Sequence, residues 1–575
     1  MICDVDIRNG YYGRVKTFKD GNEEFKPYGK EVCLNRVLEA LDSDKNKFEL
    51  KFFYNGKEKF KLVSRGQLCE IGNAQSFSDS GMDVTRQSFD CFVDSILFQE
   101  ETCFFQNMTG YCHEKLGWID IPWLDKGIGY RSQNLYSFDE EYESIYDGSF
   151  KVDLMGSKKK WMKMVRQEVL PSIPLSIVLI CAFASIPSAL LSRKYPIANG
   201  IMHLCSPSSH GKSTALYLAT SISGEPFPYT KIEKDIYGNQ IRKKSLLQSF
   251  DATNNALIEN LTGNFGVPIV IDELGKCQAK DLTSVIFALA DGNGKSRLNQ
   301  DLGVKESIGF KGTIITAGEF SIFEKCSKKL EGLHNRVFEL NEKLTSSAEQ
   351  SQRIKKCATA NNGFMAPLFA QHILAHGGIS YVSEKYDYWL NTLNESFPDT
   401  PNKMRFLETF VALYLATAEM AKEAFDLDFD IEGIQQYFLD YLASGKTANV
   451  SLNSYQDLLK EFRSNSAHFY MQKGSNDISP SVKVWGRYHR LKNNKILPDG
   501  RVIVGEYLVR ENIVDELLKE KGYTKKQCVE MWKKEQYINF EADRSTRSRK
   551  IDIHKEPENV FVFYVFEDKE ANLDE

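Results

Sequence analysis

A short segment near the middle of the chain has the residue types that bind nucleotide phosphates. Ser206-Pro207-Ser208-Ser209-His210-Gly211-Lys212-Ser213-Thr214 joins the apolar run IMHLC to the helix-like run STALYLATSI. A loop of backbone N–H groups at a helix N-terminus attracts phosphate, and a lysine reaches the outer phosphates. We expect Ser208, Ser209, His210, Gly211, Lys212, Ser213 and Thr214 to bind ATP, with the Ser213 hydroxyl on Mg²⁺. Ser206 replaces the usual first glycine, which makes the motif less specific.

Two adjacent acids end an apolar run farther along the chain. The run VPIVIDEL has the composition of a buried strand, and its acids are Asp272 and Glu273. In phosphoryl transfer to water, one acid holds Mg²⁺ and another residue activates or orients the attacking water. We therefore expect Asp272 to bind the metal and Glu273 to act as the base. The alternative is a solvated strand end without a chemical role.

Another apolar run, GTIITAG, ends in a polar residue that can sense the phosphates. Thr316 is the preferred candidate to contact the γ-phosphate and the attacking water, and Glu319 is the second candidate.

Arg336 lies directly before the apolar run VFEL, in the segment His334-Asn335-Arg336. An arginine supplied by a neighbouring subunit stabilises the charge that spreads over the transferring phosphoryl group, which accelerates hydrolysis about a thousandfold or more. We expect Arg336 to act in this way in trans. The alternative is an ordinary surface ion pair.

Cations also cluster between the acid pair and Thr316. The segment DGNGKSR continues as LNQDLGVKESIGFK, and its glycines flank two β-like runs around 301–303. This pattern predicts a protruding hairpin that carries Lys295, Arg297 and Lys305. Because phosphates attract such cations, we expect the hairpin to hold DNA in a central channel. A plain surface loop is the alternative.

These segments need a scaffold that brings them together. From about residue 196 to 342, apolar strand-like runs alternate with helical patterns. The alternation predicts an α/β fold with a parallel sheet flanked by helices. Residues up to about 445 have a helical period and predict a lid or bundle. The expected domains are an α+β module at 1–150, a P-loop ATPase core with its preceding helices at 151–345, a helical lid at 346–450 and a winged-helix-like module at 451–575.

The C-terminal expectation rests on helical runs at 455–464 and 512–521 and β-like runs at 501–508 and 560–566. Helices followed by a β-ribbon are typical of winged-helix modules that bind nucleic acid. The run RSTRSRK contains Arg544, Arg547, Arg549 and Lys550, which we expect either to grip phosphate or to form a solvated loop. At the other end, runs at 48–54 and 57–63 around Asn55-Gly56 predict a β-hairpin.

The composition limits the class of protein. The 575 residues include 73 Lys+Arg and 78 Asp+Glu, a net charge of -5, so any polyanion must bind at local patches. The 12 cysteines form no CxxC pair, which favours reduced thiols and a cytoplasmic location. Cys112 and His113, near Cys103, could ligate a metal; we expect instead a core cysteine beside a surface histidine.

The segment VLPSIPLSIVLICAFASIPSALLS, at 169–192, is long and apolar enough to cross a bilayer. Its prolines and serines, and the nucleotide-binding strand that follows it, indicate a buried helical layer instead. A transmembrane helix is the alternative. No membrane partner is expected.

Several motifs in one order resemble a known family. HLCSPSSHGKSTAL, FDATNNAL, VIDELGK, FALADGNGKSR and ITAGE are similar to the bacterial domain-of-unknown-function family 927, and the likeness extends from about residue 60 to 566. Among known proteins, these motifs resemble those of the MCM-like, self-loading replicative helicases of staphylococcal cassette chromosomes and related mobile elements.

That resemblance implies an AAA+ core, a hexameric ring around DNA and ATP-driven translocation from 3′ to 5′. It assigns Lys212 to phosphate binding, Ser213 to Mg²⁺ binding, and Asp272 and Glu273 to the acid pair. It also assigns Thr316 as the first sensor, the residue that contacts the γ-phosphate, and Arg336 as the arginine finger that acts on a neighbouring subunit's nucleotide. Arg405 is a candidate second sensor by position only. The chain lacks the paired-cysteine zinc site of archaeal and eukaryotic MCM proteins, which puts in doubt how far its N-terminal part follows their architecture.

The sequence thus predicts an ATP-dependent DNA helicase that serves the replication of a mobile element. The expected partners are single-stranded and forked DNA, further copies of the chain in a homo-hexamer, and an initiator or loading protein; the cofactors are ATP and Mg²⁺. One alternative is a P-loop ATPase that acts as a regulatory or defence switch. Another is a DNA-binding initiator or scaffold with a vestigial nucleotide fold.

Overall fold

The alternating pattern between residues 196 and 342 forms a five-stranded parallel sheet in the computed structural model. Its strands are β13 (Ile201–Cys205), β16 (Leu247–Ser249), β17 (Ile269–Asp272), β20 (Ile314–Gly318) and β21 (Val337–Leu340), in the order β16-β17-β20-β13-β21. Every neighbouring pair is parallel. The structure describes residues 3–103, 109–207, 209–234, 240–250, 254–277, 282–292, 297–298, 304–305, 309–326, 331–396, 406–443, 450–471, 483–521, 523, 525–541, 544–552 and 555–567.

Helices cover both faces of this sheet, which confirms the predicted α/β arrangement. On one face, α7 (Asn254–Leu261) and α8 (Thr283–Asp291) share a buried cluster with Ile271. On the other, α5 (Ile173–Leu191) and α6 (Lys212–Ser221) share a second cluster with Val270. Successive side chains of a strand point to opposite faces, so neighbouring residues of β17 enter different clusters.

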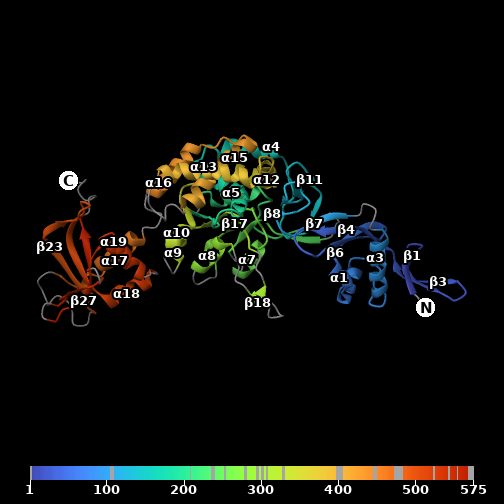
Figure 1. Ribbon diagram of the computed structural model, residues 1–575, viewed down its shortest axis with the longest axis horizontal. Coiled ribbons are helices and arrows are strands. Elements are labelled where there is room, and N and C mark those ends of the chain that lie inside the picture. Colours follow the sequence, from blue (N-terminus) through green and yellow to red (C-terminus); the bar gives the residue numbers. More distant parts are fainter. Residues whose placement is uncertain are drawn as a thin grey trace.

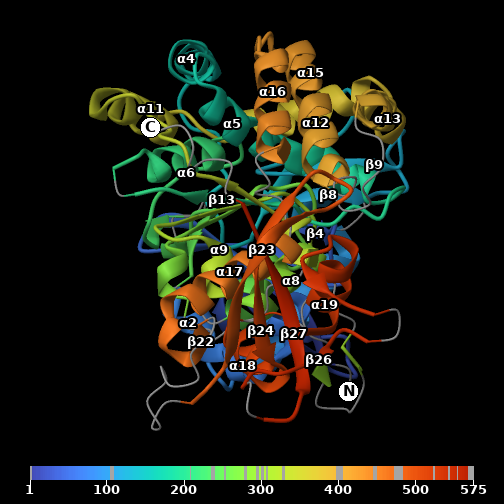
Figure 2. The ribbon, with the colours of Figure 1, turned by 90° about the vertical axis from the view of Figure 1, so that its left-hand side faces the viewer.

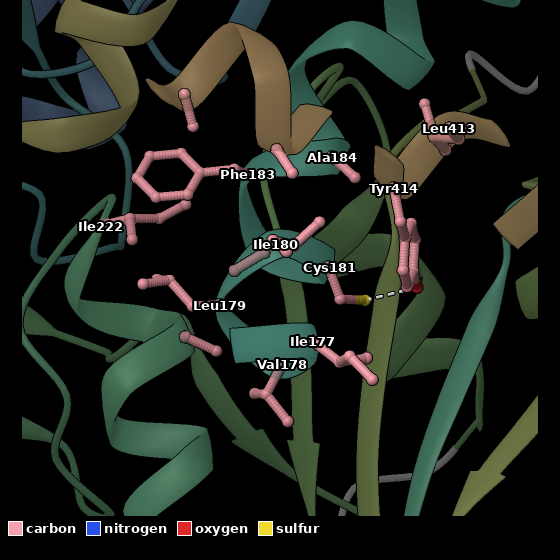
Figure 3. Close-up of a cluster of buried hydrophobic side chains, with 14 of the residues drawn as sticks. Ile177, Val178, Leu179, Ile180, Cys181, Phe183, Ala184, Ile222, Leu413 and Tyr414 are labelled. Carbon is pink, nitrogen blue, oxygen red and sulfur yellow. Dashed lines mark hydrogen bonds between the residues drawn. The ribbon is translucent and has the colours of Figure 1, made fainter. Parts of the chain in front are cut away.

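Helix α5 is the long apolar segment of the sequence, and it lies inside the protein. Every residue from Leu175 to Leu191 is buried. Among the described residues this helix alone is long and apolar enough to cross a membrane, and 89% of its most apolar window is buried. Figure 3 shows its side chains packed among those of neighbouring elements, with the Tyr414 hydroxyl 2.8 Å from Cys181 Sγ. Its apolar character therefore builds the core.

The helical lid follows the sheet. Its helices are α11 (Ala348–Ala360), α12 (Met365–Ala375), α13 (Ile379–Ser396), a π-helical turn (Leu407–Ala412) that continues as α15 (Leu413–Phe425), and α16 (Ile431–Ala443). All contribute buried side chains to the cluster that contains α5. Figure 2 shows these helices gathered at one end of the view, beyond the central sheet.

The N-terminal part contains an antiparallel sheet, a mixed sheet and three helices among its described residues. One sheet consists of β1 (Cys3–Arg8), β2 (Tyr11–Thr17) and β3 (Glu23–Lys30); the next has the order β12-β7-β4-β5-β6, with β4 (Val32–Ala40), β5 (Lys47–Tyr54), β6 (Lys57–Ser64), β7 (Thr109–His113) and β12 (Ser144–Tyr146). The helices are α1 (Arg65–Cys69), α2 (Ala74–Asp79) and α3 (Phe89–Cys103). Strands β5 and β6 form the predicted hairpin, with Asn55 and Gly56 at positive φ in its turn.

A further small sheet lies before the predicted boundary at residue 150 but shares the core of the following part. It contains β8 (Gly117–Asp120), β9 (Ile128–Arg131), β10 (Leu135–Tyr136) and β11 (Glu141–Tyr142). Trp118 donates from Nε1 to the Ile186 carbonyl of α5 at 2.9 Å, and the Tyr130 hydroxyl donates to the Gly266 carbonyl at 2.9 Å. Both aromatic rings belong to the α5 cluster.

The C-terminal part forms a separate core of helices and a six-stranded sheet. Its helices are α17 (Val450–Ser464), α18 (Glu511–Glu520) and α19 (Lys525–Lys534); its strands are β22 (Phe469–Met471), β23 (Gly486–Ile496), β24 (Val502–Arg510), β25 (Ile538–Asn539), β26 (Arg547–Arg549) and β27 (Glu558–Phe566). The predicted helices and β-ribbon are present. Figure 1 shows this part and the N-terminal part at opposite ends of the long axis.

Short elements complete the description. They are α4 (Lys158–Met164) with a π-helical turn (Val165–Val169), the hairpins of β14 (Lys231–Lys234) with β15 (Gln240–Lys243) and of β18 (Arg297–Leu298) with β19 (Val304–Lys305), and the helices α9 (Ile322–Lys325) and α10 (Glu331–His334). Single 3₁₀ turns lie at Ile71–Asn73, Leu274–Lys276 and Ser466–His468.

Candidate nucleotide-binding site

A cavity of about 740 Å³ lies at the carboxyl ends of the sheet strands, where β13 passes into α6. Ligands of open α/β sheets bind at this edge. Of the predicted phosphate-binding residues, the cavity wall contains Ser209, Gly211, Lys212, Ser213 and Thr214. The His210 carbonyl accepts from the Leu344 amide at 2.8 Å, which ties the loop to the segment after β21. Ser208 lies outside the described residues.

Gly211 caps α6 in the left-handed conformation, with φ at +92°. A Cβ at this position would lie 2.6 Å from Thr345 Oγ1 and 3.0 Å from the Thr345 backbone nitrogen. Conformation and space therefore both require glycine here. The first residues of α6, Lys212, Ser213 and Thr214, line the cavity, and the N-terminus of a helix attracts anions.

Lys212 folds back onto its own loop. Its ammonium donates to the Ser206 carbonyl and, at 3.0 Å, to the Pro207 carbonyl. Ser206 thus contributes a backbone oxygen even though its side chain departs from the glycine pattern. A phosphate in the cavity would offer the ammonium a charged acceptor in place of two neutral ones, and hydrogen bonds between charged groups are the stronger kind.

The acid pair lines the same cavity as this loop. Asp272 and Glu273 both line the wall. The Glu273 amide donates to Asp272 Oδ1 at 2.8 Å. Burial raises the pKa of Asp272, since it disfavours the charged carboxylate, while the ammonium groups of Lys212 and Lys355 oppose the rise. A divalent cation would supply the positive charge that this half-buried carboxylate needs.

Glu273 has a strained backbone. Its φ and ψ are 56° and 58°, a left-handed conformation that is rare for a residue with a side chain. Its carboxylate pairs with Lys276, three residues on in the turn that follows. Strain of this kind persists where the surrounding structure imposes it, commonly at functional sites. The strain turns the chain sharply after β17, so both acids reach the cavity.

Thr316 lies in the sheet beneath the cavity and not in its wall. Its side chain is fully buried, and Oγ1 lies 2.8 Å from Nδ1 of His203 on the adjacent strand β13. The wall is formed instead by the four residues that follow Thr316, namely Ala317, Gly318, Glu319 and Phe320. The structure thus places Glu319, the second candidate, at the cavity.

Arg336 lies away from the cavity of its own chain. It directly precedes β21, at the amino end of the parallel strands. Its guanidinium lies 5.1 Å from the Phe287 ring of α8 and donates to the Gly332 carbonyl at 3.1 Å. Arg336 therefore does not line the cavity of its own chain.

The sequence did not identify the residues between 343 and 355 that form one side of the cavity. Lys343, Thr345, Ser347, Ser351, Gln352 and Lys355, from the end of β21 to α11, also line the cavity. Ser351 Oγ lies 2.5 Å from Thr214 Oγ1, which joins α11 to α6. The run SSAEQ signalled a helix start: the Ser347 hydroxyl accepts from the Gln350 amide at 3.2 Å. Nothing in the run indicated where that helix packs.

The predicted hairpin between the acid pair and Thr316 is present in the backbone. Strands β18 and β19 are antiparallel, with Arg297 opposite Lys305. Figure 1 shows β18 at the lower margin of the central part. Lys295, like the candidate second sensor Arg405, lies outside the described residues.

The interpretation of His113 as a surface residue was wrong. Its ring is 1% exposed, with Nδ1 2.7 Å from Ser144 Oγ and Nε2 2.7 Å from the Ser132 carbonyl. Cys112 is buried, as expected. Three or more His, Cys, Asp or Glu side chains do not gather in a metal-binding arrangement anywhere in the described part of the chain.

The C-terminal sheet exposes a row of cations. Strand β23 carries Arg487, Arg490, Lys492 and Lys495 but no acidic residue, and the last three are exposed. None of the four forms an ion pair with another described residue. By contrast, Arg547 of the predicted basic run pairs with Glu541, while Arg549 is exposed. Strand β23 therefore presents a positive surface whose cations form no ion pair with another described residue.

Comparison with known proteins confirms the resemblance. Residues 41–308 match the family described as a domain of unknown function (DUF927), and residues 449–571 match the Cch helix turn helix domain. A solved structure described as "SCCmec type IV Cch - active helicase" is 19% identical, with a TM-score of 0.74 over 98% of each chain. This chain therefore has the fold of that helicase along nearly its whole length.

Two further comparisons add little. A structure of the NrS-1 C-terminal region is 10% identical and covers 70% of this chain and 89% of its own, with a TM-score of 0.21, too low to support an argument. No curated protein sequence matches the chain.

Proposed function

We propose that this protein is an ATP-driven DNA helicase with an AAA+ core. The observation that carries the proposal is the cavity wall, which brings Lys212 and Ser213 from the start of α6 together with Asp272 and Glu273 from the end of β17. These are the residue types that bind a nucleoside triphosphate with Mg²⁺ and activate water. The shared fold with a cassette helicase supports a DNA motor over the regulatory-switch alternative.

The strand order supports the AAA+ assignment. Strand β20, which leads to the Ala317–Phe320 wall, lies between β13, which precedes the phosphate loop, and β17, which ends in the acids. A hydrolase with this order can place a polar group between the phosphate loop and the base. The helical lid follows the last strand directly and reaches the same cavity through α11.

Lys212, Ser213, Asp272 and Glu273 would each have a role in hydrolysis. Lys212 would leave its loop carbonyls for the outer phosphates, and the α6 amides would hold the remaining oxygens. The Ser213 hydroxyl and the Asp272 carboxylate offer hard oxygen ligands, which fit Mg²⁺. Bound there, Mg²⁺ supplies charge neutralisation at the β- and γ-phosphates. Glu273 would take the proton of the water that attacks the γ-phosphorus as the bond to the β-phosphate oxygen breaks.

The placement of Arg336 supports a role for it in a second subunit's site. Because it lies at the opposite edge of the sheet from its own cavity, it would complete the site of a neighbour. Repetition of this contact closes a ring, and a homo-hexamer is the ring that we propose.

Two positive elements would hold DNA. We place single-stranded DNA on the β18–β19 hairpin with Lys295, Arg297 and Lys305, and duplex or forked DNA on the β23 surface of the C-terminal part. The match of that part to a helix-turn-helix domain supports the second assignment. The protein would act in the cytoplasm on a mobile element, translocating from 3′ to 5′, with an initiator or loading protein as a further partner.

Hydrolysis measured with and without DNA tests the proposal. Lys212→Ala should abolish hydrolysis with or without DNA, whereas Lys305→Ala should lower the DNA-stimulated rate more than the basal rate. Lys356→Ala, an exposed change on α11 beside the cavity residue Lys355, is the matched control and should preserve both rates. Full hydrolysis by Lys212→Ala would overturn the assignment of the site.

A further inference from the structure

His203 is buried at the centre of the sheet, directly below the nucleotide cavity. It lies on β13, opposite Thr316 of β20 in the parallel pairing, and its side chain is 0% exposed. Both ring nitrogens have partners: Nδ1 lies 2.8 Å from Thr316 Oγ1, and Nε2 lies 3.0 Å from the carbonyl oxygen of Phe320. One imidazole thus joins the strand before the phosphate loop to the far end of the cavity wall.

The chemistry of the partners fixes the positions of the protons. A carbonyl oxygen only accepts, so Nε2 must carry the proton that bonds to Phe320. Burial lowers the pKa of His203 to about 4, so the ring is neutral near pH 7. In a neutral ring the other nitrogen accepts, and the Thr316 hydroxyl must therefore donate to Nδ1. Thr316 then has no proton to offer a phosphate oxygen.

The ring also supports the wall by contact. A Cβ on Gly318 would lie 3.1 Å from Cε1 and 3.3 Å from Nε2 of His203. Gly318 therefore packs directly on the edge of the imidazole, and the Phe320 carbonyl is hydrogen-bonded two residues later. Between them stands Glu319, which lines the cavity.

We propose that His203 is a positioning residue that holds the Ala317–Phe320 wall so that Glu319, and not Thr316, orients the attacking water. The proposal rests on the ATPase function proposed above. A carboxylate accepts the hydrogen bonds of water, whereas the Thr316 hydroxyl is occupied in the sheet. His203 itself does not touch the nucleotide.

Four variants of the full-length protein test the role. His203→Leu removes both hydrogen bonds, and His203→Gln retains an amide that can donate to the Phe320 carbonyl. Thr316→Val removes only the hydroxyl, and Glu319→Gln removes only the charge. For each we would measure kcat and KM for ATP, equilibrium binding of a fluorescent ATP analogue, the thermal unfolding midpoint and amide exchange at 317–320.

Glu319→Gln should lower kcat by about a hundredfold, the lower end of the usual scale for loss of a group that assists the attacking water. His203→Leu, which only displaces Glu319, should lower kcat by about tenfold or more, and both should change analogue binding much less. His203→Gln should restore most of kcat, and Thr316→Val should lower it by less than about threefold, because the Phe320 bond is intact. Amide exchange in the wall should rise in His203→Leu but not in His203→Gln.

Three outcomes would overturn the proposal: wild-type kcat in His203→Leu, equal losses in His203→Gln and His203→Leu, or a larger loss in Thr316→Val than in Glu319→Gln. If His203→Leu fails to fold, the comparison of Thr316→Val with Glu319→Gln still decides which residue acts. The proposed function fails differently, since the wild type would then bind the analogue without turnover. In that event, an unchanged rate of amide hydrogen exchange at residues 317–320 in His203→Leu would still contradict the positioning role of His203.

Discussion

Arg336 Nη2 lies 3.4 Å from Asp291 Oδ1, the last residue of α8, at the edge of the sheet opposite the nucleotide cavity. The hairpin of β18 and β19 begins a few residues after Asp291. Arg336 Nε is buried without a hydrogen-bond partner among the described residues. The ion pair is partly exposed and therefore weak, so in the assembly that we propose a phosphate bound in a neighbouring subunit would displace Asp291.

Mixing two inactive variants tests the trans arrangement. Arg336→Ala retains the phosphate-binding lysine but lacks the arginine that would act on a neighbour. Lys212→Ala retains that arginine but lacks the lysine. Each variant alone should therefore lose hydrolysis. In mixed oligomers, Arg336 of a Lys212→Ala subunit can complete the cavity of an Arg336→Ala subunit. We expect hydrolysis to reappear on mixing. Continued inactivity of mixtures that demonstrably co-assemble would contradict the role of Arg336.

A glycine pair tests the shape of the phosphate loop. Gly211→Ala combines left-handed strain, about 1–2 kcal/mol, with a clash against Thr345, so ATP affinity should fall by about tenfold or more. Gly56 has a φ of +73° and nothing within 4 Å of an added Cβ, so Gly56→Ala carries the strain without the clash. Calorimetric titration should show unchanged ATP binding in Gly56→Ala. Equal losses in both variants would mean that contact with Thr345 is irrelevant.

The buried histidines make stability depend on pH. Burial lowers the pKa of His113 and of His203 to about 4. The unfolded chain has an ordinary histidine pKa of about 6.5 and binds more protons between these values, so the free energy of unfolding falls as the pH falls through this window. For each histidine the loss between pH 7 and pH 5 is about 2 kcal/mol.

Urea unfolding at pH 7 and pH 5 measures this dependence. His203→Gln cannot titrate there, so its stability should decline by about 2 kcal/mol less than that of the wild type over the same interval. His113→Gln should show the same reduction. An identical decline in the wild type and both variants would show that folding leaves the pKa of these two histidines unchanged.

The β23 surface predicts a salt-dependent contribution to DNA binding. Arg490→Ala with Lys492→Ala removes two exposed cations, so duplex affinity should weaken for every sequence and the salt slope should fall by about two. ATP hydrolysis without DNA should not change, because β23 belongs to a separate core. Binding assays at several salt concentrations give both values. Lys483→Ala, whose charge already pairs with Glu516, is the matched control.

Local patterns predicted the parts of the site that local sequence controls. The positions of the loop around Lys212 and of the acids at the end of β17 are each set by a strand that is followed by a turn. Both features appear where the sequence pattern predicted them. The alternation of strands and helices likewise predicted the parallel sheet, because each element must bury one face.

Contacts between distant segments were not predictable in this way. The link between His203 and Thr316 depends on β13 and β20 being neighbours, which only the strand order decides. The wall from α11 depends on how that helix packs on α6, and the burial of His113 depends on Ser132 and Ser144 meeting it. Likewise, Trp118 joins the core through an α5 carbonyl far along the chain.

Unwinding of forked duplexes tests the central claim most directly. After its mass is measured with a non-hydrolysable ATP analogue, the wild type would be given forks with only a 3′ or only a 5′ tail. We predict a hexamer that unwinds the 3′-tailed fork when ATP is present, with Lys212→Ala and Glu273→Gln inactive. A monomer that unwinds neither fork would contradict the account.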